Sequence, residues 1–132
     1  MDMKSISGLV CYVKDLDATA AFYEALGFRP GNRDDNTLTI YLNWFSIRFV
    51  AQAVGADPSF AKETAPGHEG AGIYTTIKVD DVDEFYKGVI ALGIKPVNKP
   101  KEWPWGNREF TLRDPDGYKL VFFQNSKHKL KQ

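Results

Sequence analysis

Apolar and polar residues alternate in residues 107–113 and again in 118–124. A period of two predicts β-strands with one buried face. The intervening sequence Asp-Pro-Asp-Gly at 114–117 is a strong turn signal, and a type I turn with glycine at the bulge would pair Arg113 with Lys119. One face then holds Phe110, Leu112, Leu120 and Phe122, and the other holds Glu109, Thr111, Arg113, Lys119, Val121 and Phe123. The second, mixed face suits a wet cleft better than a helix-packed core.

Two further runs, residues 6–13 and 71–79, are rich in Val, Ile, Tyr and Thr and predict strands. Each run is followed by an aspartate that can cap a helix, Asp15 and Asp81. Glu84 would complete a partial capping box in the second helix. Both helices are expected to end at a Leu-Gly pair, at 26–27 and 92–93.

Each predicted helix has an apolar stripe that would pack on a sheet. The stripes are Leu16, Ala20 and Tyr23 with Leu26 or Phe22, and then Val82, Phe85, Val89 and Leu92. Two more strands are expected at 37–43 and 45–51. Alternation places Ile73, Ile77 and Val79 toward the helix, and leaves Tyr74, Thr76, Lys78 and, in the first strand, Gly8, Val10 and Tyr12 toward the cleft.

The chain repeats itself at a constant offset, since Val13 to Asp17 aligns with Val79 to Asp83, and Ala25 to Pro30 aligns with Ala91 to Pro96. Repeated units usually bury their apolar faces against one another, which creates a cleft between equivalent strands. We therefore expect residues 1–132 to form a single domain of two modules, about 5–52 and 71–125, joined by a linker at 53–70.

Composition excludes several classes of protein. Seventeen Lys and Arg residues balance 17 Asp and Glu residues, so no basic field indicates nucleic-acid binding. No apolar run is long enough to span a membrane, and the N-terminus does not resemble a signal peptide, so a cytoplasmic location is expected. The single cysteine, Cys11, excludes an internal disulfide and a CxxC motif and is expected to be a small core residue.

Two tryptophans, Trp103 and Trp105, lie in a Pro- and Gly-containing segment, 99–106, that reads as a loop. Large indole rings are costly to leave in water. They should therefore cover a ligand, a partner chain or the edge of their own core.

In combination, these features resemble the vicinal oxygen chelate superfamily, which includes glyoxalase I, extradiol dioxygenases and bleomycin-resistance proteins. The resemblance runs from about Ile6 to Gln124, and its carriers are the strings at 13–17, 22–28, 79–82 and 114–117. Residues 104–115, with Trp-Gly, Arg-Glu-Phe and Asp-Pro, are similar to the bleomycin-binding branch. The resemblance implies an α+β fold in which paired βαβββ modules form a curved, cleft-bearing mixed sheet with helices on its convex face.

The metal enzymes of this superfamily place His or Glu at four strand positions, which correspond here to Gly8, about Arg48, Tyr74 and Val121. None of these is a credible ligand, because divalent metals need imidazole, carboxylate or thiolate donors. His68 in the linker and His128 in the Lys-rich tail lie on no predicted strand. No metal and no cofactor is therefore expected.

Glu109 has two interpretations. In a partly apolar cleft its carboxylate could act as a base with a raised pKa. The favoured alternative is a salt bridge to Arg48, Arg113 or Lys119. No Ser-His-Asp set or activated cysteine is visible.

The leading hypothesis is a metal-independent protein that binds a planar or aromatic small molecule, such as an antibiotic, in the cleft between the modules. The expected ligand-binding residues are Tyr12, Arg48, Tyr74, Trp103, Trp105, Glu109, Arg113 and Phe123. The basic residues of this face favour an anionic ligand over a cationic one. The resemblance further implies a homodimer.

Two alternatives remain open. One is an enzyme, a glyoxalase-like lyase or isomerase or a dioxygenase, that uses a divalent metal or Glu109 as base. The other is an interaction domain without a ligand, whose tryptophans would be buried in a dimer interface.

Overall fold

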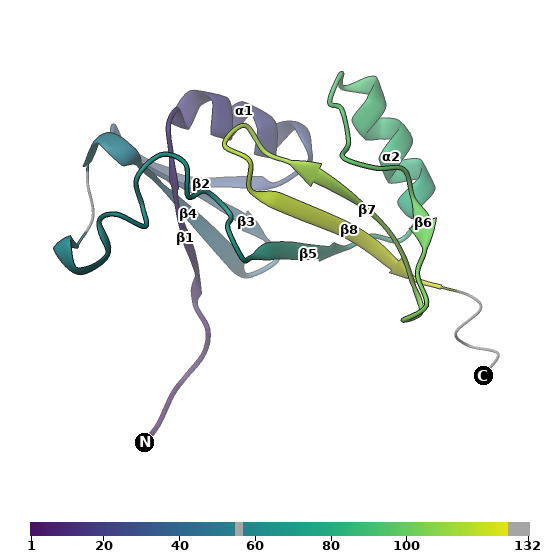
Figure 1. Ribbon diagram of the computed structural model, residues 1–132, viewed down its shortest axis with the longest axis horizontal. Helices are drawn as coiled ribbons and strands as arrows, with labels where there is room; N and C mark the ends of the chain where they lie inside the picture. The colour runs from purple at the N-terminus through teal and green to yellow at the C-terminus, as the bar shows by residue number, and fades with distance from the viewer. Residues whose placement is uncertain (55–56, 127–132) are drawn as a thin grey trace. The chain divides into compact units, whose positions relative to one another are not determined.

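The computed structural model describes residues 1–54 and 57–126. The chain divides into two compact units, residues 1–69 (unit 1) and 70–132 (unit 2) (Figure 1). Unit 1 contains β1 (Gly8–Val13), α1 (Leu16–Ala25), β2 (Arg29–Arg33), β3 (Thr37–Leu42) and β4 (Phe45–Ala51). Unit 2 contains β5 (Tyr74–Lys78), α2 (Val82–Ala91), β6 (Lys101–Glu102), β7 (Asn107–Arg113) and β8 (Lys119–Asn125). The predicted α+β fold with paired βαβββ modules is confirmed.

The two units share one sheet topology. The strand order is β1-β4-β3-β2 in unit 1 and β5-β8-β7-β6 in unit 2. In each unit the first strand pairs in parallel with the last, and the remaining pairs are antiparallel. The helix between the first two strands makes this parallel pairing possible, because a parallel connection must cross over the sheet.

Both helices begin and end where the sequence predicts. The Asp15 carboxylate accepts hydrogen bonds from the backbone N–H groups of Asp17 and Ala18, and the Asp81 carboxylate accepts one from Glu84 N–H. These bonds satisfy N–H groups that have no partner within the helix. Each helix is followed by a glycine with positive φ, 103° at Gly27 and 82° at Gly93, a conformation that residues with a Cβ rarely adopt.

Aromatic side chains form the core of each unit. In unit 1, Tyr23 of α1 contacts Phe28 and Phe49, with ring centroids 5.3 and 4.9 Å away. In unit 2, Phe85 of α2 stacks on Phe122 of β8 at 4.5 Å, and Phe122 in turn stacks on Phe110 at 5.4 Å. Each helix thus covers one face of its own sheet, which leaves the other face of that sheet without a helix.

The C-terminal hairpin has the predicted register. Arg113 pairs with Lys119, and Phe110 pairs with Phe122. The turn is closed by a backbone bond from Gly117 N–H to Asp114 O (2.9 Å), and Gly117 has a φ of 98°. The four residues predicted on the core face, Phe110, Leu112, Leu120 and Phe122, are all buried.

Several details differ from the prediction. The residues that form β2 and β6 were not identified from the sequence, because Arg29–Arg33 contains Pro30 and Gly31 and β6 has only two residues within the segment that reads as a loop. Leu92, expected in the apolar stripe of α2, is 52% exposed because it caps the helix end. Ile73 is half-exposed rather than packed on the helix, because it precedes the first residue of β5.

Two short 3₁₀ turns, Gln52–Val54 and Pro58–Phe60, lie at the start of the segment expected to link the modules and within it. Its residues up to Glu69 belong to unit 1. That the two modules act as a single domain stays a prediction. Within the described residues, no helix has the length and apolar character needed to cross a membrane. Cys11, expected in the core, is partly exposed in β1.

Candidate functional site

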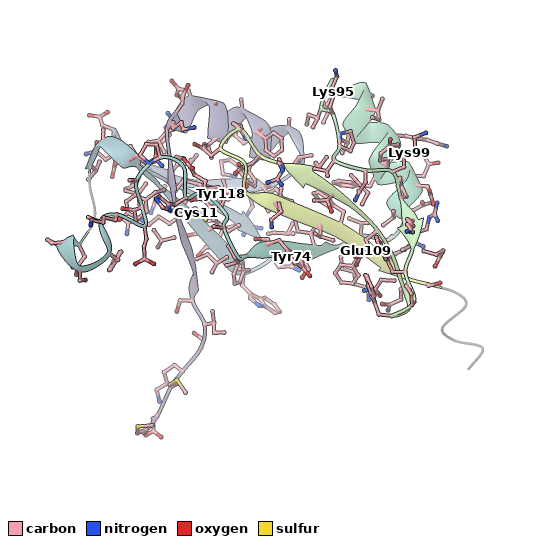
Figure 2. The ribbon with its side chains drawn as sticks, viewed as in Figure 1. Cys11, Tyr74, Lys95, Lys99, Glu109 and Tyr118 are labelled. Carbon is pink, nitrogen blue, oxygen red and sulfur yellow. The ribbon has the colours of Figure 1, made fainter. Side chains whose placement is uncertain are left out.

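The sheet of unit 2 has a helix-free face, defined by the residues that alternate with those packed under α2. Register places these residues in rows across the strands. The first row is Tyr74, Lys119 and Arg113; the second is Thr76, Val121 and Thr111; the third is Lys78, Phe123, Glu109 and Lys101. Figure 2 shows Tyr74 on β5 and Glu109 on β7. All four predicted ligand-binding residues on the strands of unit 2, Tyr74, Glu109, Arg113 and Phe123, therefore lie on this face.

The two predicted tryptophans form a stacked pair. The Trp103 and Trp105 rings are 4.8 Å apart and only 8° from parallel. The backbone N–H of Trp103 donates to the backbone carbonyl of Asn107 at 2.8 Å, so the β6–β7 pairing continues to Trp103. Trp103 therefore lies on the same side of the sheet as Lys101, two residues earlier. Lys101 Nζ lies 4.3 Å from the centre of the Trp103 ring. Trp105 is 58% exposed, so the pair leaves an indole surface free for contact.

Glu109 lies next to Phe123 and Lys101 in the third row. Among the described residues of unit 2 it forms no ion pair with Arg113 or Lys119, so that part of the expected salt bridge is wrong. The reason is spacing, because Arg113 is four residues further along β7, about 13 Å away. Glu109 and Phe123 instead put a carboxylate beside a partly exposed aromatic ring.

Tyr74, Lys119 and Arg113 form the first row. Lys119 Nζ lies 5.9 Å from the centre of the Tyr74 ring. Arg113 is exposed, and its guanidinium donates one hydrogen bond to Gly117 O (2.9 Å). Two cations thus stand directly opposite each other on neighbouring strands, a pairing that is normally unfavourable.

The tryptophan pair and the first row lie at opposite ends of the helix-free face. Trp103 is beside Asn107, whereas Arg113 is six residues further along the same strand. At about 3.3 Å per residue these positions are about 20 Å apart. A small planar molecule cannot touch both the tryptophan pair and the first row, whereas a long ligand can.

The remaining predicted residues, Tyr12 and Arg48, belong to unit 1. Both lie on the helix-free face of its sheet, where Tyr12 pairs with Val50 and Arg48 pairs with Val10 and Thr39. Arg48 is exposed and Tyr12 is partly exposed. That they join the residues of unit 2 in one site stays a prediction.

Unit 1 also contains a polar cavity of about 350 Å³ that no sequence pattern indicated. Its lining is Lys14, Asp15, Leu16, Asp17, Arg33, Asp34, Asp35 and Ala51. Most of its carboxylates have structural roles: Asp15 caps α1, Asp17 pairs with Arg33, and Asp34 accepts hydrogen bonds from the backbone of Asn36 and Thr37. These bonds to Asn36 and Thr37 hold the pKa of Asp34 below its ordinary value. The cavity thus reflects local turn chemistry.

Sequence reasoning missed Lys101 as a site residue because β6 was not predicted. The available signal was the spacing of Lys101 and Trp103, which are two residues apart and so share a face of an extended strand. Lys119 was placed on the correct face, but its contact with Tyr74 depends on the parallel pairing of β5 with β8, which only the fold supplies.

Comparison with known proteins decides the family. The family model described as the glyoxalase/bleomycin resistance protein/dioxygenase superfamily matches residues 5–122. The chain belongs to this superfamily. A bleomycin resistance protein of Klebsiella pneumoniae is 30% identical over 119 residues, which cover 85% of this chain and 86% of that protein. One from Geobacillus stearothermophilus is 28% identical over 123 residues, covering 87% and 92%.

Solved structures of the superfamily show the same fold. A bleomycin-binding protein crystallised with bleomycin matches with a TM-score of 0.65 and 27% identity, covering 93% of this chain and 100% of that one. A bleomycin resistance determinant encoded on transposon Tn5 matches with a TM-score of 0.65 and 27% identity, covering 92% and 98%. The similarity thus extends over almost the whole of both chains.

The positions that correspond to metal ligands in other members of the superfamily do not suit a metal here. Gly8 has no side chain, and a Cβ at this position would lie 2.5 Å from Ser46 O. Val121 lies between Thr76 and Thr111, and Arg48 is cationic. Tyr74 is left as a single weak candidate. Across residues 1–54 and 57–126, no cluster of three His, Cys, Asp or Glu side chains suitable for a metal is found. His128 lies outside the described residues.

Proposed function

We propose that this protein binds and sequesters a planar or aromatic small molecule without using a metal. The observation that carries the proposal is the Trp103–Trp105 pair, in which the rings are nearly parallel and Trp105 is 58% exposed. Lys101 Nζ lies over the Trp103 ring of this pair. Stacked aromatic surfaces of this kind bind flat ligands through dispersion and quadrupole interactions. The bleomycin-binding relative supports the same class of function.

The proposed contacts follow the rows of the helix-free face. The tryptophan pair stacks on the ligand, Phe123 adds an aromatic surface, and Glu109 accepts a hydrogen bond from a polar group. Tyr12 and Arg48 of unit 1 complete the site in a cleft between the two modules. The remaining proposed contacts, Tyr74 and Arg113, are about 20 Å from the tryptophans and are reached only by a long ligand.

Tryptophan fluorescence tests this proposal. The third tryptophan, Trp44, is 91% exposed in unit 1, so Trp44→Phe removes its emission and leaves the tryptophan pair as the reporter. In this background, bleomycin should quench the emission saturably after treatment with a chelator. Trp105→Ala should weaken binding about fivefold or more, since each stacking contact contributes on the order of 1 kcal/mol. Unchanged affinity in Trp105→Ala would refute the proposed site.

The enzyme alternative makes a different prediction for Glu109. If Glu109 is a catalytic base, Glu109→Gln abolishes turnover while the protein still binds its substrate. If the protein only binds, Glu109→Gln changes affinity modestly because an amide retains the shape and one acceptor oxygen. Measurement of both affinity and turnover for the same variant separates the two functions.

We also propose that the protein acts as a homodimer in the cytoplasm. Met1, Met3 and Ile6 in the N-terminal arm are exposed, as expected of a segment that contacts a second chain. Light scattering coupled to size-exclusion chromatography should give about twice the monomer mass. A deletion of residues 2–6 should shift this equilibrium toward the monomer, and a monomeric full-length chain would refute the proposal.

A further inference from the structure

We propose that the first row of the helix-free face of unit 2 binds the anionic group of an aromatic acid, with Arg113 and Lys119 as its partners. This inference rests on the proposed binding function and specifies its ligand class. It concerns the part of the face that is about 20 Å from the tryptophan pair.

The distribution of charge in unit 2 is strongly asymmetric. The helix-free face carries four cations and one carboxylate, namely Lys78, Lys101, Arg113, Lys119 and Glu109. The acidic residues of the helix side are largely engaged: Asp83 pairs with Arg108, Glu84 pairs with Lys87, and Asp81 caps α2. The strand residues of the helix-free face therefore carry an excess of positive charge.

Arg113 and Lys119 concentrate this charge at one point. They are directly opposite each other in the β7–β8 ladder, where like charges repel. Neither forms an ion pair within the described residues. Arg113 uses one of its five N–H donors on Gly117 O, so the others remain able to bind an oxyanion. An anionic group bound between the two side chains would relieve their repulsion and accept charge-assisted hydrogen bonds.

The third member of the row supplies an aromatic surface. Tyr74 is 58% exposed, and Lys119 Nζ lies 5.9 Å from the centre of its ring. A carboxylate, sulfonate or phosphate attached to a flat ring can thus contact the cations while the ring packs beside Tyr74. A cationic ligand meets repulsion at the same position. This chemistry separates the first row from a site built for a positively charged drug.

The test compares three probes that share the naphthalene ring system and differ in charge: naphthalene-2-carboxylate, naphthalene-2-carboxamide and 2-naphthylmethylammonium. In isothermal titration calorimetry the carboxylate should bind at least about tenfold more tightly than the carboxamide, and the ammonium should bind least. This preference should shrink at high salt, because the charged side chains are accessible to screening ions.

Two sets of variants test which residues cause the preference for the carboxylate over the carboxamide. Arg113→Gln with Lys119→Gln should abolish it, and Lys119→Gln alone should reduce it while keeping the Arg113 bond to Gly117 O. The matched control is Lys95→Gln with Lys99→Gln, which removes the same charge from the exposed segment beside α2 (Figure 2) and should keep the preference. Circular dichroism confirms that each variant is folded.

The outcomes distinguish this inference from the proposed function. Equal binding of the carboxylate and carboxamide, or tighter binding of the ammonium, overturns the anionic class. If bleomycin still binds in a Trp105-dependent way, the proposed function stands. A preference that survives the double substitution overturns the assignment to Arg113 and Lys119. If neither the probes nor bleomycin bind, both proposals are refuted.

Discussion

Arg108 and Asp83 form a bidentate ion pair between β7 and the first turn of α2. Arg108 Nε and one terminal nitrogen each donate to a different oxygen of the Asp83 carboxylate at 2.9 Å. This geometry ties α2 to the strand that carries Glu109 and Arg113. The hydrogen bonds from Arg108 lower the pKa of Asp83 by more than burial raises it.

Replacement of Arg108 by lysine should weaken unit 2, because an ammonium group cannot form the two parallel bonds. The Asp83 side chain is 50% exposed, so solvent screening limits the expected loss to about 0.5–1 kcal/mol in the free energy of unfolding. Urea denaturation of wild type and Arg108→Lys measures this loss. The control Lys87→Gln, which removes the exposed pair with Glu84, should cost less than about 0.5 kcal/mol. An equal effect in both variants would contradict a special role for the bidentate pair.

Glu69 should make stability depend on pH. Its side chain is only 6% exposed, and burial alone raises its pKa. Its own backbone, Gln52, Gly67 and Lys14 stabilise the charged form more strongly, so the pKa lies below its ordinary value. A lowered folded-state pKa contributes stability above the unfolded-state pKa, and this contribution is lost as pH falls through the folded-state pKa.

Glu69→Gln should therefore destabilise the protein at neutral pH by about 1–3 kcal/mol, the cost of losing buried charge-assisted hydrogen bonds. The difference from wild type should shrink between about pH 5 and pH 2, as Glu69 becomes protonated. Thermal denaturation of both proteins across this pH range measures the difference in stability. Glu63→Gln, which alters an exposed carboxylate in the same segment, should change little at any pH. A constant deficit in Glu69→Gln would show that charge is not the cause.

Two glycines should respond to alanine in opposite directions. A Cβ at Gly8 would lie 2.5 Å from Ser46 O and 2.6 Å from Ser46 Oγ, so β1 and β4 would have to separate. Gly8→Ala should therefore cost about 1–3 kcal/mol. Gly88 lies within α2 with nothing within 4 Å of an added Cβ, so Gly88→Ala should stabilise by about 0.5–1 kcal/mol. Chemical denaturation compares them, and stabilisation by Gly8→Ala would contradict the observed packing of β1 on β4.

The elements with local signals could be predicted from sequence. Asp15 and Asp81 cap helices through bonds to residues two or three positions away, and the turn at 114–117 sets the pairing of Arg113 with Lys119. These features depend on short stretches of chain, which carry their own conformational preferences. β2 could not be found in this way, because its Pro30 and Gly31 contradict strand propensity and the strand depends on its pairing with β3.

The candidate site was predictable only as a face of a sheet. Alternation placed Glu109, Arg113 and Phe123 on one side, and register confirms it. It did not reveal that the tryptophans stack on each other or that Arg108 pairs with Asp83, 25 positions away. Such contacts depend on the fold because no local pattern specifies them.

Metal ions should leave the stability of this protein unchanged. Saturation at one hundred times Kd would stabilise the fold by about 2.7 kcal/mol, which raises Tm by several degrees for a chain of this size. Gly8, Arg48 and Val121 supply no donor, and the space beside Gly8 is filled by Ser46. Differential scanning fluorimetry with a chelator, and then with Zn²⁺, Ni²⁺ or Mn²⁺, should therefore give one Tm.

A rise in Tm with one of these ions would contradict the prediction, and variants would then locate the donors. Loss of the rise in Tyr74→Phe would implicate the one weak oxygen donor at the family positions, whereas loss in Glu109→Gln would place the ion beside Phe123 on the helix-free face. Either result would favour the enzyme alternative, because a metal held beside an exposed aromatic face can act as a Lewis acid on a bound ligand.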